Sequence, residues 1–312
     1  VLSDLLKEQR ADIEKFTKDK ELQKEYTQRV FPELLESLRR DTTCGVFLVM
    51  ANDQPIGAPG DFTGFFLRDS DPVTKADTNS DLLLERGDKT LARQWGITLD
   101  NSWSPAFRFQ GKGIRESDDF FYEPYTAGMA HTGVDMASLG YWSMPFILED
   151  YEMDNHKMIT YSVPLVNDGV IYGVVGTEVS VSYLCNTYFR VQDLNRQQTA
   201  GYAIAVDNGD GTYENIAGKG NLYDAVQREN GIFKLESTKH EDLFKVKDSK
   251  IGSQEIYALF SKMNLYANNV PYKNTNWVLC GFVAEDSIFS LGDKLYSDIL
   301  TTIVACAVLG LV

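Results

Sequence analysis

Two apolar runs rich in β-branched and aromatic residues, at 158–166 and 170–181, are separated by Asn167-Asp168-Gly169. Asp-Gly between two such runs is the strongest short-range signal for a β-hairpin, because glycine accepts the positive φ that the turn requires. The feature constrains the fold more than any other in the chain, since it predicts antiparallel pairing at the centre of the sequence.

Other short apolar runs are bounded by Gly, Pro, Asn and Asp and predict further strands. A polar helical stretch at 182–198 divides them into two sets. Asp207-Asn208-Gly209-Asp210-Gly211 predicts a second hairpin within the later set. Both sets close with an apolar strand, an acidic residue (Glu178, Glu285) and a helix start, which supports two similar α+β modules in tandem. The runs are 44–50, 64–68 and 106–109, then 202–206, 213–216, 255–262 and 277–284.

The first 40 residues are rich in Leu, Glu, Lys, Gln and Arg, and their apolar residues mostly recur three or four positions apart. This spacing predicts an amphipathic helical region. Pro32 is its only helix-breaking residue, so we expect one helix to end near Val30 and another to begin there. The region is either a surface helix packed on the core or a stalk that follows a membrane span, and the pattern allows both.

The last residues, 299–312, are uncharged and increasingly apolar. They are fewer than the roughly 20 apolar residues that cross a bilayer. They form either a buried C-terminal helix or the start of a span that the end of the sequence cuts off. We favour the second interpretation, which makes the sequence a fragment of a longer membrane protein.

Composition excludes several functions. The chain of 312 residues has 30 Lys and Arg against 45 Asp and Glu, and a net charge of −15 opposes non-specific nucleic-acid binding. Its four cysteines and three histidines lack the spacing of a disulfide scaffold or a zinc site. An EF-hand beginning at Asp207 would need an acid where Gly218 stands. We therefore predict no metal site, no cofactor and no catalytic residues.

Several segments together resemble the double Cache sensor domain of bacterial transmembrane receptors, over nearly the whole chain. They are the helical N-terminus, Trp142-Ser143-Met144-Pro145-Phe146, the hairpin from Tyr161 through Glu178, Trp277-Val278-Leu279, and the apolar exit. The resemblance implies an α+β fold: a long N-terminal helix, two tandem PAS-like modules with antiparallel sheets, and an exit helix into a membrane span.

The resemblance also implies an organisation and a role. The expected segments are a stalk helix (1–40), a membrane-distal ligand-binding module (41–195), a membrane-proximal module (196–285), and an exit helix with the start of a span (286–312). The chain would be the extracytoplasmic ligand-sensing part of a signal-transduction receptor in the cell membrane. It would form a homodimer and transmit its signal to a cytoplasmic output domain. That domain would be a chemotaxis signalling helix, a histidine kinase or a cyclic-dinucleotide enzyme.

Relatives that bind amino acids resemble one another in a pocket where Arg, Trp and Tyr hold the carboxylate, and a Tyr and two acids hold the ammonium. Their Arg-x-Trp-Tyr element falls on residues 119–122 here and keeps only Tyr122. Their Pro-Tyr-x-Asp element falls on residues 145–148 and loses both the phenol and the acid. The last acidic position falls on Glu178. A free amino acid is therefore disfavoured, because no matching guanidinium would pair with its carboxylate.

The residues that remain are carboxylates and aromatic rings, which suit an organic cation through ion pairing and cation–π attraction. We hypothesise an amine or quaternary ammonium ligand. The competing interpretation is that the rings are core and the acids, including Asp118, are solvated loop residues. The predicted ligand-binding residues are Asp119, Phe121, Tyr122, Tyr125, Tyr141, Trp142, Phe146 and Glu178.

Two other classes of function are the alternatives. A membrane-anchored extracellular hydrolase would need a nucleophile–base pair, and Ser143 lies in no G-x-S-x-G motif. A structural surface protein would tend towards an all-β sandwich, whereas this chain opens with about 40 helical residues. We predict that this chain is not an enzyme.

Overall fold

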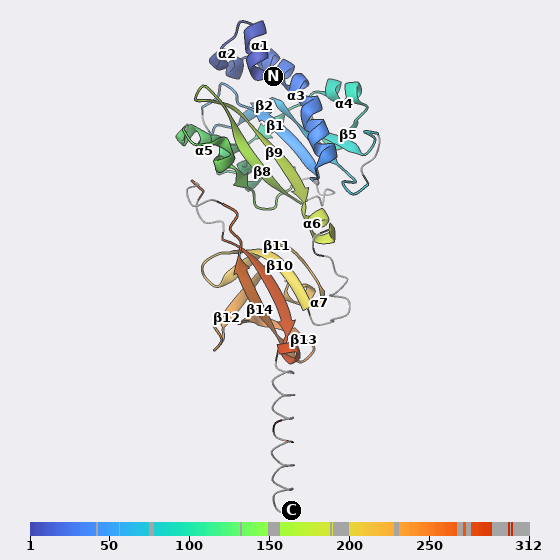
Figure 1. Cartoon of the computed structure of the whole chain (residues 1–312), viewed down its shortest axis with the longest axis vertical. Helices are drawn as coiled ribbons and strands as arrows, with labels where there is room; N and C mark the ends of the chain where they lie inside the picture. Colours follow the sequence, from blue (N-terminus) through green and yellow to red (C-terminus); the bar gives the residue numbers. More distant parts are fainter. Residues whose placement is uncertain are drawn as a thin grey trace, which may run out of the picture. The chain divides into compact units, whose positions relative to one another are not determined.

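The computed structural model describes residues 1–41, 43–55, 57–74, 78–131, 133–148, 157–187, 189, 200–227, 231–266, 271–272, 276–288, 299 and 301 (Figure 1). Contacts divide the chain into two compact units. Unit 1 comprises Val1–Tyr183 and Tyr266–Lys273, and unit 2 comprises the described part of Leu184–Leu265 and Asn274–Val312.

Unit 1 is built on a seven-stranded sheet in the order β5-β4-β3-β1-β9-β8-β7. Neighbouring strands pair antiparallel except β4 and β5, which are parallel. A separate ribbon pairs β2 (Gly60–Phe62) with β6 (Phe107–Phe109). The sheet strands are β1 (Gly45–Met50), β3 (Gly64–Asp69), β4 (Leu82–Arg86), β5 (Thr98–Ser104), β7 (Tyr141–Trp142), β8 (Met158–Asn167) and β9 (Val170–Ser180).

The predicted central hairpin is confirmed. Strands β8 and β9 pair along their whole length, from Met158 opposite Ser180 to Asn167 opposite Val170. The two turn residues, Asp168 and Gly169, both have positive φ, at 48° and 79°. This is the backbone that an Asp-Gly turn favours, because Asp tolerates the left-handed region and Gly adopts it freely.

The N-terminal region forms three helices, α1 (Leu2–Glu8), α2 (Ile13–Lys18) and α3 (Lys20–Arg40), in place of the single long helix expected. The expected break at Pro32 is wrong, since α3 continues through that residue. The break lies at Asp19, whose carboxylate accepts hydrogen bonds from the N–H groups of Glu21 and Leu22 and so caps α3. Tertiary packing outweighs the cost of Pro32, because its neighbour Phe31 is fully buried.

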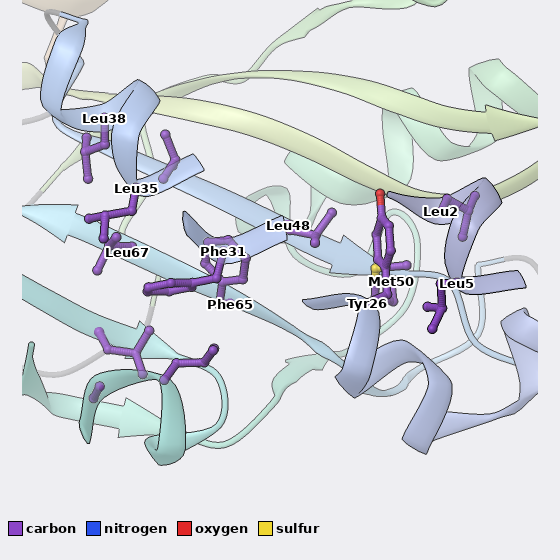
Figure 2. Packing of buried hydrophobic residues seen from close by; sticks show 14 of the residues in the cluster. Leu2, Leu5, Tyr26, Phe31, Leu35, Leu38, Leu48, Met50, Phe65 and Leu67 are labelled. Carbon is purple, nitrogen blue, oxygen red and sulfur yellow. The ribbon is translucent and has the colours of Figure 1, made fainter. Parts of the chain in front are cut away.

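The two faces of the sheet bury different clusters. On one face, α3 packs Tyr26, Phe31, Leu35 and Leu38 against alternate residues of β1 and β3, as Figure 2 shows. On the other face, Phe47 and Val49 of β1 join an aromatic cluster with α5 (Asp119–Ala130). A short helix, α4 (Lys89–Trp95), contributes Leu91 and Ala92 to the first cluster. Strand alternation thus gives β1 a helix on one side and the α5 cluster on the other.

Unit 2 is a closed barrel of six antiparallel strands, β10 to β15 in sequence order. The second predicted hairpin is confirmed by β10 and β11, and the runs at 255–262 and 277–284 form β14 and β15, which pair with each other. The antiparallel sheet is closed on itself, because β10 pairs with both β11 and β15. Helix α6 (Val181–Thr187) begins in unit 1 and ends in unit 2. The other elements of unit 2 are α7 (Asn221–Val226), β10 (Ala200–Asp207), β11 (Thr212–Lys219), β12 (Ile232–Ser237), β13 (Phe244–Ile251), β14 (Gln254–Lys262) and β15 (Trp277–Ala284).

Most of the predicted exit segment, 286–312, lies outside the described residues. Among the helices that are described, none combines the length and apolar character of a bilayer crossing. Cys44, Cys185 and Cys280 are free thiols. Burial raises the pKa of Cys44 to about 11 and that of Cys280 to about 12.

One buried side chain ties the N-terminal helices to the sheet. Gln23, 1% exposed, places its amide nitrogen within hydrogen-bond distance of the carbonyl oxygens of Phe16, Thr17 and Ala51, at 3.2, 3.1 and 2.6 Å. It therefore bridges α2, α3 and the end of β1.

We predict that Gln23→Ala lowers the free energy of unfolding by about 2–3 kcal/mol, because it leaves buried carbonyl groups without a donor. Chemical denaturation monitored by circular dichroism would measure the change. Gln28→Ala, at an exposed position of the same helix, is the control and should stay within about 0.5 kcal/mol of the parent protein.

Candidate functional site

A row of polar residues crosses the α5 face of the unit 1 sheet. The strand register places Thr160 opposite Glu178, Glu178 opposite Gly45, and Gly45 opposite Arg68. Thr160, Gly45 and Arg68 each lie two positions from a residue of the α5-face cluster, namely Met158, Phe47 and Phe66 in that order. Because side chains alternate between the two faces of a strand, these positions share the α5 face. We call Ser143, Thr160, Glu178, Gly45 and Arg68 the polar row.

The row is deeply buried. Thr160 and Glu178 are 0% exposed, and Arg68 is 8% exposed. Gly45 leaves room for the carboxylate, since a Cβ at that position would collide with Glu178 Oε2. Burying a carboxylate this far out of water costs several kcal/mol unless it is paired and hydrogen-bonded.

Arg68 brings a buried guanidinium into the polar row. It comes from a different strand, β3, and contacts Glu85 at 2.8 Å and Asp100 at 3.2 Å. Sequence reasoning missed Arg68. The available signal was the pair Arg68-Asp69 at the end of an otherwise apolar strand, GFFLRD, because charged residues are rarely buried without a partner.

The hydroxyl groups next to Glu178 differ in their bonding. Ser143 exchanges two hydrogen bonds with Thr160: its Oγ accepts from Thr160 N–H at 2.9 Å, and its own N–H donates to Thr160 O at 3.0 Å. Thr160 Oγ1 and Ser162 Oγ are buried and have no hydrogen-bond partner among the described residues. Buried hydroxyls of this kind are costly unless a bound molecule bonds to them.

Asp119 begins α5 and is half-buried. Burial, reinforced by the nearby charges of Glu123 and Glu116, raises the pKa of Asp119 from 3.8 to about 6. Tyr141 on β7 pairs with Ser162, and its pKa is raised by burial first and by the charge of Asp119 next. A cation near Asp119 would lower the pKa of this carboxyl and would be attracted by it.

Aromatic rings adjoin the polar row. Phe146 stacks on Phe120 with ring centroids 5.4 Å apart and an interplanar angle of 7°. Phe120 in turn meets Phe47 edge-on at 5.0 Å. Phe47 lies in β1 two residues from Gly45, so these rings border the row on its α5 side.

Three other predicted residues contribute to the aromatic cluster of the α5 face. Phe121 stacks on Phe109 at 5.0 Å and on Tyr125 at 5.2 Å, while Tyr122 Oη donates to the carbonyl of Ala58 at 2.7 Å. These three side chains pack with the β2–β6 ribbon as aromatic core. Strand alternation turns Trp142 away from Tyr141, and its ring lies 5.0 Å from that of Tyr161. Of the predicted residues, Tyr141 and Glu178 therefore lie on strands of the α5 face, while Asp119, Phe121, Tyr122, Tyr125 and Phe146 lie on α5 or in the aromatic cluster packed with it.

The described residues meet the requirements of a metal site and of a ligand cavity to different extents. No group of three or more His, Cys, Asp and Glu side chains among them could hold a metal ion. A cavity of about 180 Å³ between α3 and the start of α4 is lined by residues that include Lys24 and Asp88, which form an ion pair at 2.7 Å. This cavity contains none of the predicted site residues.

No protein-family model matches the sequence, and a search of curated proteins gives no match. Solved structures are similar to the chain at 13% identity. The extracellular domain of soHK1S-Z6, assigned as a histidine kinase, has a TM-score of 0.42 and covers 93% of this chain and 85% of its own. For methyl-accepting chemotaxis protein X, the TM-score is 0.43 and the coverage 83% and 81%.

A third similar structure is the ligand-binding domain of the Pseudomonas aeruginosa amino acid chemoreceptor PctB in complex with L-Arg. Its TM-score is 0.39, and the match covers 86% of this chain and 78% of that one. At this identity, the site residues are assigned from the geometry of this chain alone.

We predict that Thr160→Val raises the free energy of unfolding by about 1 kcal/mol, because it removes a buried hydroxyl that the fold leaves unbonded. Thr177→Val on the neighbouring strand is the matched control. Its hydroxyl donates to Gly45 O at 3.0 Å, so its loss should lower the free energy of unfolding by about 1 kcal/mol. Urea denaturation of both variants checks the pair, and destabilisation by Thr160→Val would show that the hydroxyl is bonded in the fold.

The raised pKa of Asp119 predicts a pH dependence. The folded protein binds this proton more tightly than the unfolded chain, so the stabilisation is complete below about pH 4 and is lost as the pH rises through about 6. Asp119→Asn should remove this decline and raise the free energy of unfolding at pH 7.5 by about 1 kcal/mol, after some loss of helix-dipole stabilisation. Denaturation between pH 4 and 8 measures it, and Asp61→Asn, at an exposed carboxylate, should keep the decline.

Proposed function

We propose that the chain is the extracytoplasmic ligand-sensing domain of a bacterial transmembrane signal-transduction receptor. It binds a small molecule with an ammonium group, an amine or a quaternary ammonium, at the polar row of unit 1. The observation that carries the proposal is the fully buried Glu178 carboxylate, bordered by two unbonded hydroxyls and by aromatic rings.

Charge favours a cation at this site. The guanidinium of Arg68 already contacts two carboxylates, Glu85 and Asp100, so an anionic ligand would have to compete with both. Glu178 and Asp119 add negative charge on the same side of the sheet, and the aromatic faces add cation–π attraction. Thr160 and Ser162 hydroxyls can accept hydrogen bonds from an ammonium N–H group.

The sheet provides a route from binding to signalling. Gly45 and Phe47 of β1 lie on the ligand side, while the alternate residues Val46 and Leu48 pack against the N-terminal helices. A ligand that binds one arrangement of β1 more tightly than another shifts the equilibrium between the two arrangements, and with it the packing of α3. The size of the shift is set by the difference between the two affinities. In the proposed receptor, the flanking segments anchor the domain in the membrane, and the domain acts as a homodimer without catalytic activity.

Calorimetric titration of the 312-residue chain with amines, quaternary ammonium compounds, amino acids, purines and carboxylates tests the proposal. We expect binding by compounds with an ammonium group. Glu178→Gln should weaken that binding about 30-fold or more, because the cation loses a charged, buried partner. Glu33→Gln, at an exposed position of α3, is the control and should leave it unchanged. Binding by carboxylates alone would contradict a cationic ligand.

A further inference from the structure

A segment of the barrel sequence belongs to the first unit. Its described residues, Tyr266 and 271–272, lie in the chain between β14 and β15 of unit 2, yet contacts assign them to unit 1. Its described residues include two tyrosines, Tyr266 and Tyr272. We call these two residues the tyrosine strap.

The strap bonds to the edge of the unit 1 sheet. Strand β7 is the last strand of that sheet and has only two residues. The N–H of Trp142 donates to Tyr266 Oη at 3.0 Å, and the same hydroxyl lies 3.4 Å from Trp142 O. Tyr272 Oη donates to the carbonyl of Leu139, just before β7. Side-chain hydroxyls thus bond to backbone groups that an edge strand would otherwise expose.

The strap also packs against a residue beside the candidate site. The ring of Tyr272 lies 5.1 Å from that of Tyr141 and 5.5 Å from that of Tyr266. Tyr141 is buried and shares the α5 face with Ser162 through their strand pairing. Tyr141 is buried and Tyr272 is half-buried, and burial is the main cause that raises the pKa of both hydroxyls.

The strap is connected to the polar row through a short chain of bonds. Trp142, held by Tyr266, is followed by Ser143, which exchanges two hydrogen bonds with Thr160. Thr160 lies directly opposite Glu178. Glu178 is thus connected to Tyr266 in three steps: the strand pairing with Thr160, the two hydrogen bonds between Thr160 and Ser143, and the peptide unit between Ser143 and Trp142. We expect a displacement of Thr160 or Glu178 to alter the position of Trp142 and its bond to Tyr266.

We propose that Tyr266 and Tyr272 are positioning residues that couple the polar row to barrel strands β14 and β15. The hydrogen bonds from the strap fix the position of β7. Strand β7 in turn positions Ser143, whose bonds to Thr160 keep Thr160 opposite Glu178. Tyr266 and Tyr272 lie in the chain between β14 and β15, so we expect a change in their bonding to alter the end of β14 and the start of β15. Its use in signalling rests on the proposed function, but its existence does not. Coupling of this kind is reciprocal. A change that weakens the bonds of the polar row should also weaken the bonds of the strap, and a change that weakens the bonds of the strap should also weaken those of the row.

Hydrogen exchange measured by mass spectrometry on the 312-residue chain, with no added ligand, tests the coupling. Tyr266→Phe should increase the hydrogen-exchange rate about fivefold, because one hydrogen bond is lost. We expect the increase in peptides that cover residues 141–143 and 158–162, the end of β14 and the start of β15. Tyr272→Phe should act on the same peptides. Tyr202→Phe is the control, at a 43% exposed position on β10, and should change none of them.

The reverse perturbation makes the test reciprocal. Ser143→Ala removes the acceptor of Thr160 N–H and should speed exchange around residues 263–266 as well as at 158–162. Exchange that changes only within 139–143 and 264–272 in the strap variants would reduce the strap to local packing and overturn the proposal. Because no ligand is used, this outcome is independent of the calorimetric titration, and either experiment can fail alone.

Discussion

The alternation of side chains along β1 is the constraint on which unit 1 depends. Each residue of this central strand is buried, and successive residues face opposite layers. Val46, Leu48 and Met50 require a cover of helices, which α1 to α3 provide. Gly45 and Phe47 face the other layer, where α5 and its aromatic rings lie. A shift of the strand by one residue would exchange the two layers, so the register of β1 with β3 and β9 fixes the site as well as the core.

The polar row is a local departure from that hydrophobic pattern. The same face carries Phe47, Phe66 and Val174 nearby, and substitution of the row by apolar residues would suit the fold better. Arg68 is held by ion pairs to Glu85 and Asp100, and the missing side chain at Gly45 leaves room for the Glu178 carboxylate. A buried set of charges and unbonded hydroxyls at the centre of a sheet is a reason to assign function there, since such sites commonly sacrifice stability for binding.

The sequence predicted local structure well where the signal was local. The Asp168-Gly169 turn, the later hairpin and the pairing of β14 with β15 all follow from turn chemistry and β-rich runs. Pro32 shows the limit of this reasoning, because burial of Phe31 and Leu35 keeps α3 intact through a residue that breaks isolated helices. The closure of the barrel could not be predicted either, since no local pattern shows that β10 pairs with β15 across most of unit 2.

For the site, the sequence by itself determined the kinds of group available: acidic residues, aromatic rings and the acidic end of β9 at Glu178. Only the tertiary structure decided which of them meet. It assigned Phe121, Tyr122 and Tyr125 to the aromatic core, turned Trp142 to the opposite face, and brought Arg68 of β3 and Glu178 of β9 into register with Gly45. The physical reason is that turns and helix caps depend on neighbouring residues, whereas a buried charge depends on long-range strand register, which the order of residues alone leaves open.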